Sequence, residues 1–122
     1  MAGYNWTVDL DEEAQFVVQR IEGEIEEAEF KALIKETERC VARLRNPGDL
    51  RFLVDGRGLG KADARIRRLA FKTFRERGVN RMALWGCAPF IRIILRIMSV
   101  AVGNGRIRTF AQEEEARTWL AG

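Results

Sequence analysis

The stretch LRFLVDGRGLGK, residues 50–61, holds a short apolar run that ends at an aspartate and continues into a glycine-rich loop. Phe52, Leu53 and Val54 follow one another with no polar residue between them, which is typical of a strand buried on both faces. Residues 62–77 then carry apolar side chains at helical spacing. A buried strand that leads through a loop into a helix predicts a parallel α/β sheet.

The chain before this stretch shows both a strand period and a helix period. Residues 4–10 alternate between apolar and polar, and residues 16–22 are rich in β-branched and aromatic side chains. Two strands with a short polar connection favour an antiparallel hairpin. From residue 26 the apolar residues recur every three or four positions, which indicates a helix that ends at Asn46-Pro47-Gly48.

The chain after this stretch continues the alternation. Residues 81–85 predict another buried strand, Pro89 is suited to the first turn of a helix over 89–103, and residues 106–110 predict an edge strand. Three glutamates then open a closing helix. The predicted order is β-β-α-β-α-β-α-β-α, an α/β fold with a mostly parallel sheet and an antiparallel first strand. We expect one domain over residues 1–122.

The composition argues against catalysis and against membrane insertion. The chain contains no histidine, so the commonest general base and metal ligand is missing. Cys40 and Cys87 stand far apart, as expected of buried thiols in a reducing compartment. We find no signal peptide, and the longest apolar stretch is too short to span a bilayer. We therefore expect a cytoplasmic protein that is not an enzyme, with no cofactor and no metal site.

Several segments, in this order, carry a resemblance to a known family. They are VQRIEG (18–23), FLVD (52–55), MALWG (82–86), IRTF (107–110) and the final EEEARTWL (113–120). The sequence resembles the STAS domains, and more closely the broad bacterial group of SpoIIAA-like proteins. The resemblance implies a sheet of four or five strands with helices packed against it. The topology is also similar to that of CRAL-TRIO lipid-transfer domains, which bind apolar ligands.

One feature of the STAS group is absent from this sequence. In its anti-sigma-factor antagonists, a phosphorylatable serine or threonine follows the strand that here ends at Asp55. Residues 56–64 contain neither amino acid. We therefore expect no phosphorylation site and no partner switch of that kind.

The helix predicted over residues 89–103 is unusually apolar. Ten of the thirteen residues from Phe90 to Val102 are apolar, and Arg92 and Arg96 lie on one narrow stripe. A helix that covers one sheet face needs only a stripe of apolar residues. Apolar residues of this helix that stay exposed would mark an interface with a second copy or another protein. The alternatives are that neighbouring helices bury them, that they bind an apolar ligand, or that they make a peripheral membrane contact. The predicted interface residues are Phe90, Ile91, Ile94, Leu95 and Met98.

Charge is distributed unevenly, and two further clusters are candidate binding sites. Residues 1–30 hold nine carboxylates and one arginine, whereas the rest of the chain holds twenty basic and nine acidic side chains. The loop at 56–61 does not have the spacing of a P-loop, so it is either a turn or an anion site. A basic stripe on the second helix is either solvated or contacts an anionic partner, and no motif indicates nucleic acid. The stripe consists of Arg65, Arg68, Lys72 and Arg75.

The tentative ligand-binding residues are Asp55, Arg57, Lys61, Arg92 and Arg96. Asp55 is included because α/β sheets bind ligands at the carboxyl ends of their strands. The sequence thus predicts a non-catalytic regulatory or interaction module that acts through helix 89–103. The alternative is a carrier or sensor of an apolar or anionic small molecule, as the similarity to CRAL-TRIO domains implies.

Overall fold

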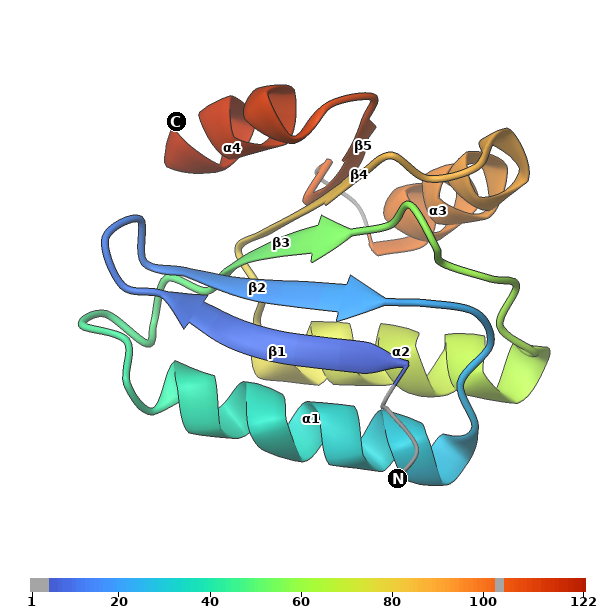
Figure 1. The fold of residues 1–122 in the computed structure, drawn as a ribbon, viewed down its shortest axis with the longest axis horizontal. Coiled ribbons are helices and arrows are strands. Elements are labelled where there is room, and N and C mark those ends of the chain that lie inside the picture. Colours follow the sequence, from blue (N-terminus) through green and yellow to red (C-terminus); the bar gives the residue numbers. More distant parts are fainter. Residues whose placement is uncertain (1–4, 103–104) are drawn as a thin grey trace.

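A computed structural model describes residues 5–102 and 105–122 as one five-stranded sheet with four helices (Figure 1). The predicted element order and the mixed sheet are confirmed. The sequence predicts that Tyr4 belongs to a strand, Gly103 to a helix end and Asn104 to a break, and these residues lie outside the described ones. The elements are β1 (Trp6–Asp11), β2 (Phe16–Ile21), α1 (Glu27–Val41), β3 (Arg51–Asp55), α2 (Ala64–Arg77), β4 (Arg81–Trp85), α3 (Pro89–Val102), β5 (Ile107–Phe110) and α4 (Glu113–Ala121).

The strands lie in the sheet in the same order as in the chain, β1-β2-β3-β4-β5. β1 pairs with β2 antiparallel, from Trp6 opposite Ile21 to Asp11 opposite Phe16. The remaining pairs are parallel. β5 is an edge strand, as its imperfect alternation indicated.

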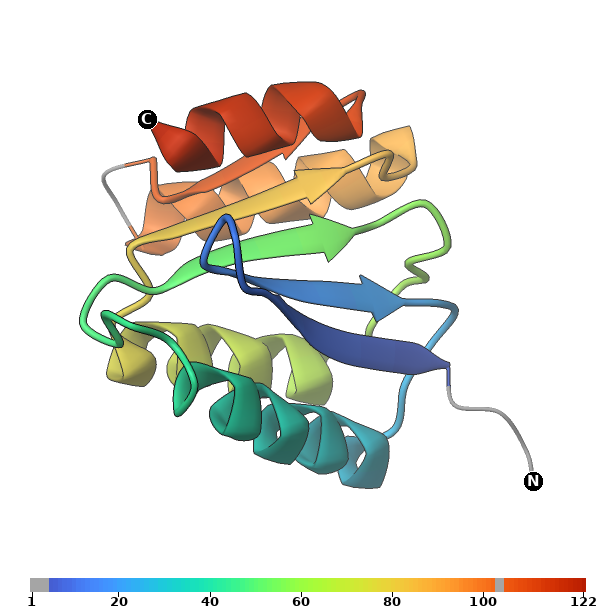
Figure 2. The same ribbon diagram turned by 60° about the vertical axis from the view of Figure 1, so that its left-hand side comes forward.

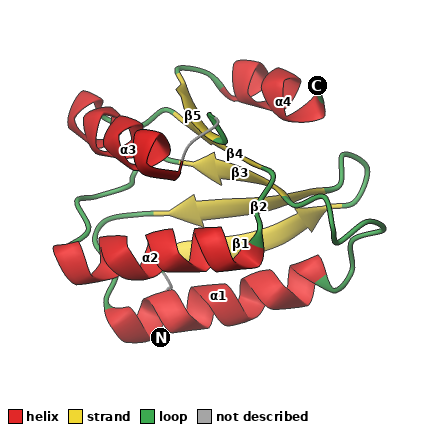
Figure 3. Ribbon diagram, turned by 180° about the vertical axis from the view of Figure 1, so that it is seen from behind, coloured by secondary structure: helices red, strands yellow, loops and turns green. Residues whose placement is uncertain are grey.

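The helices divide unequally between the two faces of the sheet. Parallel neighbours are joined by right-handed crossovers, and a sheet that grows in one direction places these crossovers on one face. Figures 2 and 3 accordingly show α1 and α2 side by side on one face, with α4 on the opposite face. α3 shares the face of α1 and α2, since Ile91 packs in the same core cluster as Phe74 and Val41.

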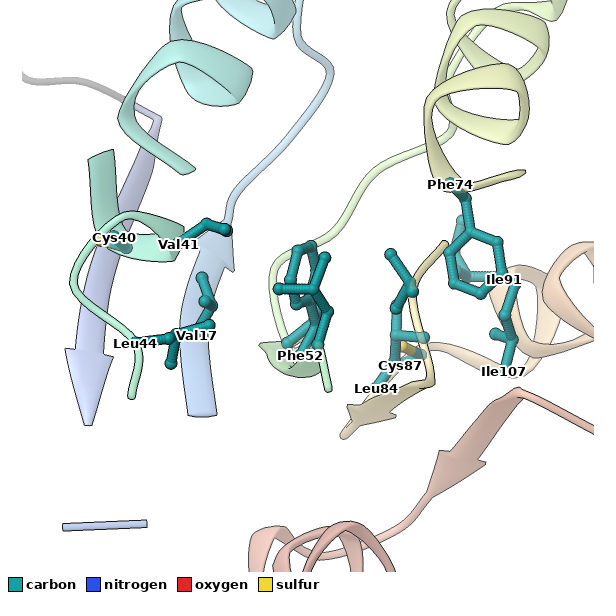
Figure 4. Close-up of a cluster of buried hydrophobic side chains, with 13 residues drawn as sticks. Val17, Cys40, Val41, Leu44, Phe52, Phe74, Leu84, Cys87, Ile91 and Ile107 are labelled. Atoms are coloured by element: carbon teal, nitrogen blue, oxygen red, sulfur yellow. The ribbon is translucent and has the colours of Figure 1, made fainter. Parts of the chain in front are cut away.

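The main core lies between the sheet and the three crossover helices. Figure 4 shows Val17, Phe52 and Leu84 in a row across adjacent strands, facing side chains from the helices. A smaller cluster on the other face packs Ala116 and Leu120 of α4 against Phe16, Leu53 and Ala83. Leu53 is 1% exposed, so the central strand is covered on both sides, as its unbroken apolar run predicted.

Local signals fix the ends of α2 and α3. The Asp63 side chain caps α2 by accepting a hydrogen bond from the backbone N–H of Ile66 over 2.9 Å. Gly78 ends the helix in the left-handed conformation, with φ of 69°. Pro89 is the first residue of α3, as its fixed φ angle and missing N–H favour.

Candidate functional site

An apolar ridge runs along the outer side of α3. Phe90, Ile93, Ile97 and Val100 form this ridge and are 52%, 58%, 65% and 78% exposed. Ile91, on the inner side, is 6% exposed and belongs to the core. The helix therefore presents apolar surface on the side that faces away from the sheet.

The predicted interface residues fall on three sides of α3. Phe90 belongs to the exposed ridge, and Ile91 is buried against the sheet. Ile94, Leu95 and Met98 are half-buried. Ile94 and Met98 face α2, and Leu95 packs on the core.

A groove lies between α2 and α3, and we call it the α2–α3 groove. Its volume is about 730 Å³. Phe71 of α2 and Phe90, Ile94, Ile97 and Met98 of α3 supply its apolar lining. The ridge of α3 therefore forms one wall of the groove.

Cationic side chains form the other wall. Lys61, Arg67, Arg68, Lys72 and Arg75 all line the groove, and the described lining contains no carboxylate. Two of these cations also lie against aromatic rings of the lining. Lys61 Nζ is 5.7 Å from the ring centroid of Phe90, and Arg75 Cζ is 5.3 Å from that of Phe71.

The acidic partners of α2 lie on its other side, toward α1. Arg65 pairs with Glu27 over 3.2 Å, and Arg77 pairs with Glu38 over 2.7 Å. Within residues 5–102 and 105–122, no salt bridge involves a cation that lines the groove. Two of these cations, Arg68 and Lys72, also line a hollow with Glu27 on the side toward α1. The described lining of the groove itself is cationic and holds no carboxylate.

The tentative ligand-binding residues do not form one site. Lys61 lines the groove, whereas Asp55 is the last residue of β3 and Arg57 lies over Trp85 at the end of β4. Arg92 and Arg96 are exposed, and neither lines the groove. With about 100° per residue, their positions fall on the flank of the ridge that faces away from α2.

Asp55 and Arg57 form a closed pair. Arg57 donates from Nε to Oδ1 over 3.1 Å and from Nη2 to Oδ2 over 2.9 Å, and its backbone N–H also bonds Oδ1. These bonds hold the pKa of Asp55 below its ordinary value, and the Arg57 side chain is the main cause. The guanidinium also lies 4.4 Å from the ring centroid of Trp85. Asp55 is therefore an ionised, fully engaged carboxylate.

The glycines of the 56–60 loop are needed for close packing. A Cβ on Gly56 would overlap the Sγ atom of Cys87, and a Cβ on Gly60 would stand 2.8 Å from the carbonyl carbon of Gly23. Gly60 donates a backbone hydrogen bond to the Gly23 carbonyl over 3.1 Å, so the loop is bound to the end of β2. Packing within the protein thus accounts for the GxGxG spacing.

Apolar cavities lie under α2. One has a volume of about 170 Å³ and a second about 150 Å³. Their sides include β-strands, α1 and α3, and the hydrogen-bonded pair Gln19 and Thr37 lies at the wall of the first cavity. Both cavities are lined by Ile21, Phe30, Leu59, Ala70, Leu95 and Met98.

Both cysteines are free and buried. Burial raises the pKa of the Cys87 thiol to about 11 and also raises the pKa of Cys40. A thiol with a raised pKa is a poor nucleophile at neutral pH. In the described part of the chain, no three His, Cys, Asp or Glu side chains are grouped as potential metal ligands. Over the same residues, no helix is both long and apolar enough to cross a membrane.

Sequence reasoning identified the basic stripe and the apolar helix but not their shared groove. It did not single out Arg67 and Phe71, which complete the α2 wall, or Ile93, Ile97 and Val100, which complete the ridge. The helical positions of these residues were available in the sequence. The order of the strands in the sheet decides which helices are neighbours. The sequence pattern does not contain that order.

Comparison with known families identifies the class of protein. Residues 16–121 match the SpoIIAA-like family, and this range runs from β2 to α4 and includes the residues of the groove. The chain therefore belongs to the SpoIIAA-like family, and the resemblance seen in the sequence is confirmed.

A solved structure supports the same fold. The chain is similar to the crystal structure of an uncharacterized protein with a SpoIIAA-like fold from Shewanella loihica PV-4. The TM-score is 0.72 at 14% sequence identity, over 98% of this chain and 97% of that chain. At this identity the likeness extends to the fold alone. No curated protein matches the chain.

Proposed function

We propose that this chain is a non-catalytic interaction module that binds a protein partner, or a second copy of itself, through α3 and the adjoining groove. The exposed apolar ridge is the observation that carries the proposal. Withdrawing a large apolar side chain fully from water contributes roughly 1.5–3 kcal/mol. A ridge of four such residues is therefore unfavourable in water and favourable in an interface.

The chemistry elsewhere in the chain supports a non-catalytic role. Asp55, at the strand end where α/β enzymes place functional groups, is fully engaged by Arg57. Cys87 has a pKa of about 11 because it is buried. The chain has no histidine to act as a base near neutral pH.

Site-specific photo-crosslinking in the organism that encodes the protein tests this proposal. A diazirine amino acid is placed at Ile97 on the ridge and, as a control, at Lys35 on the exposed side of α1. We expect discrete protein adducts from position 97 that position 35 does not give, and loss of these adducts when Ile93→Asp is added. Absence of adducts at position 97, or the same adducts at both positions, would contradict an interface at α3.

The cavities under α2 support a second candidate function, a carrier of a small apolar molecule. A dry apolar cavity of about 150 Å³ is large enough to bind a ligand of benzene size. The two cavities share six lining residues, so together they form one continuous apolar region. Native mass spectrometry of gently purified protein should show a retained mass. Repeated spectra of the bare chain would contradict a carrier role.

A further inference from the structure

We propose that the α2–α3 groove receives an acidic amphipathic helix from a different protein. This inference rests on the proposed function and names the chemistry of the partner. The occupant would place leucine-like side chains on Phe71, Ile94 and Met98 and carboxylates beside the cations of α2. Two properties of the groove support this occupant, its charge and its shape.

The charge of the groove selects an anionic occupant. Five cations and no carboxylate line it within the described chain, and none of the five takes part in a salt bridge there. An apolar helix alone would leave these cations opposite uncharged surface. A helix with glutamates or aspartates along one side would pair with them and gain both affinity and a fixed orientation.

The same charges disfavour a second copy of the chain. A two-fold dimer through this face brings the same surface of both copies together, so two cationic grooves with no carboxylate in their described lining would face one another. α3 contains Arg92 and Arg96 and no acidic residue, so its far flank offers no compensation. The carboxylate-rich part of this chain lies in residues 1–30, outside the groove.

The shape of the groove selects a helix over a flat surface. Its lining comes from three successive turns of α2, from Ala64 to Arg75, and from two turns of α3, from Phe90 to Met98. Two neighbouring helices with a concave apolar floor match the helix-in-groove mode of recognition. A planar bilayer would instead contact the most exposed residue of the ridge, Val100, and leave Phe71 uncovered.

Two synthetic peptides provide the test. Both contain about 14 residues, the length of α2, and both place leucines at positions 1, 4, 5, 8 and 11. One has glutamates on the polar side and the other has lysines. Binding is measured by calorimetry against the full chain. We expect the glutamate peptide to bind at least about tenfold more tightly than the lysine peptide, with an affinity that falls as salt is raised.

Matched variants assign the binding to the groove. Lys72→Glu reverses a cation of the groove, whereas Lys35→Glu makes the same change on the exposed side of α1. Ile97→Asn changes a lining residue, whereas Ala32→Asn makes an apolar-to-polar change on the exposed side of α1. We expect Lys72→Glu and Ile97→Asn each to weaken binding about tenfold or more, and both controls to bind as the wild type does. All four positions are exposed, so circular dichroism should show an unchanged fold.

Three results would overturn the inference. The first is equal binding of both peptides or of neither. The second is binding to anionic lipid vesicles with equal dependence on Ile97 and Val100 and no peptide binding. The third is a dimer in light scattering that Ile97→Asn dissociates. In the third case α3 still binds a protein, so only the partner chemistry fails. In the second case the proposed function stands only if position 97 also gives protein crosslinks. The absence of crosslinks at position 97 would instead remove the proposed function itself.

Discussion

Arg117 of α4 donates a hydrogen bond from Nη1 to Oδ2 of Asp11 over 2.9 Å, which joins residues 106 positions apart. Arg117 also bonds Glu113 within its own helix over 2.8 Å. The bond to Asp11 fixes α4 to the tip of the β1–β2 hairpin.

We predict that a double-mutant cycle on Asp11→Asn and Arg117→Gln will give a coupling of about 0.5–1 kcal/mol, because both side chains are partly exposed. Urea unfolding of the wild type, both single variants and the double variant measures it. The coupling should shrink in 1 M salt, where exposed charges are screened. Additive single effects would show that the pair does not hold α4 in solution.

The Asp55–Arg57 pair predicts how stability depends on acid. The folded pKa of Asp55 lies below its ordinary value of 3.8, chiefly because Arg57 bonds the carboxylate. A lowered folded pKa stabilises the protein above the unfolded pKa, and this stabilisation is lost as the pH falls through the folded value. Asp55→Asn should therefore lower the free energy of unfolding at pH 7 and differ less from the wild type below pH 3.8.

Urea titrations from pH 7 to pH 3 measure this difference. Arg57→Gln removes the same pair from the other side, so its loss of stability should fade over the same range. A loss that stays constant from pH 7 to pH 3 in both variants would contradict the role assigned to this pair.

Gly60 and Gly48 form a matched pair for the loop packing. A Cβ on Gly60 would stand 2.8 Å from a backbone carbon, which cannot move without shifting β2. A Cβ on Gly48 would meet only the Asn46 side chain at 3.4 Å. We predict that Gly60→Ala lowers the free energy of unfolding by about 1–3 kcal/mol. Gly48→Ala should stay within about 0.5 kcal/mol of the wild type. Thermal unfolding compares the two, and equal losses would argue against a tightly packed loop.

Ala70 and Ala83 test whether the cavities under α2 are empty space. Ala70 lines both cavities. Ala83 belongs to β4, is 0% exposed and packs against α4. We predict that Ala70→Met raises the free energy of unfolding by about 0.5–2 kcal/mol because it fills space. Ala83→Met should lower it by about 1–3 kcal/mol because it overpacks. Chemical denaturation measures the free energy of unfolding of both variants. A lower value for Ala70→Met would mean that the cavities under α2 are already filled.

Most of the fold could be predicted because its signals are local. The unbroken apolar run at Phe52–Val54 marked a central strand, and Gly78 and Pro89 marked helix ends by their backbone preferences. The antiparallel start followed from the short connection between two strands. Each of these signals depends on residues close together in the chain, so the sequence pattern contains them.

The groove could not be predicted in the same way. The basic side of α2 and the apolar side of α3 were each visible in the sequence. Lys72 and Ile94 line one groove only because two crossover helices lie next to each other on the sheet. The burial of Ile91 beside the exposure of Ile93 likewise depends on how α3 is rotated over β5. The sequence also could not show that the candidate ligand-binding residues lie apart, because their distances depend on how the helices and loops pack on the sheet. These residues are Asp55, Arg57, Lys61, Arg92 and Arg96.

The order of the strands in the sheet also affects how the sheet assembles during synthesis on the ribosome. Every strand from β2 onward pairs with the strand made before it, so the growing edge of the sheet is covered by the next strand to emerge. Nascent intermediates therefore never wait for a distant piece of the polypeptide to complete the sheet, which keeps unpaired edges short-lived. The helix α4 also reaches back to the first hairpin, where Arg117 bonds Asp11.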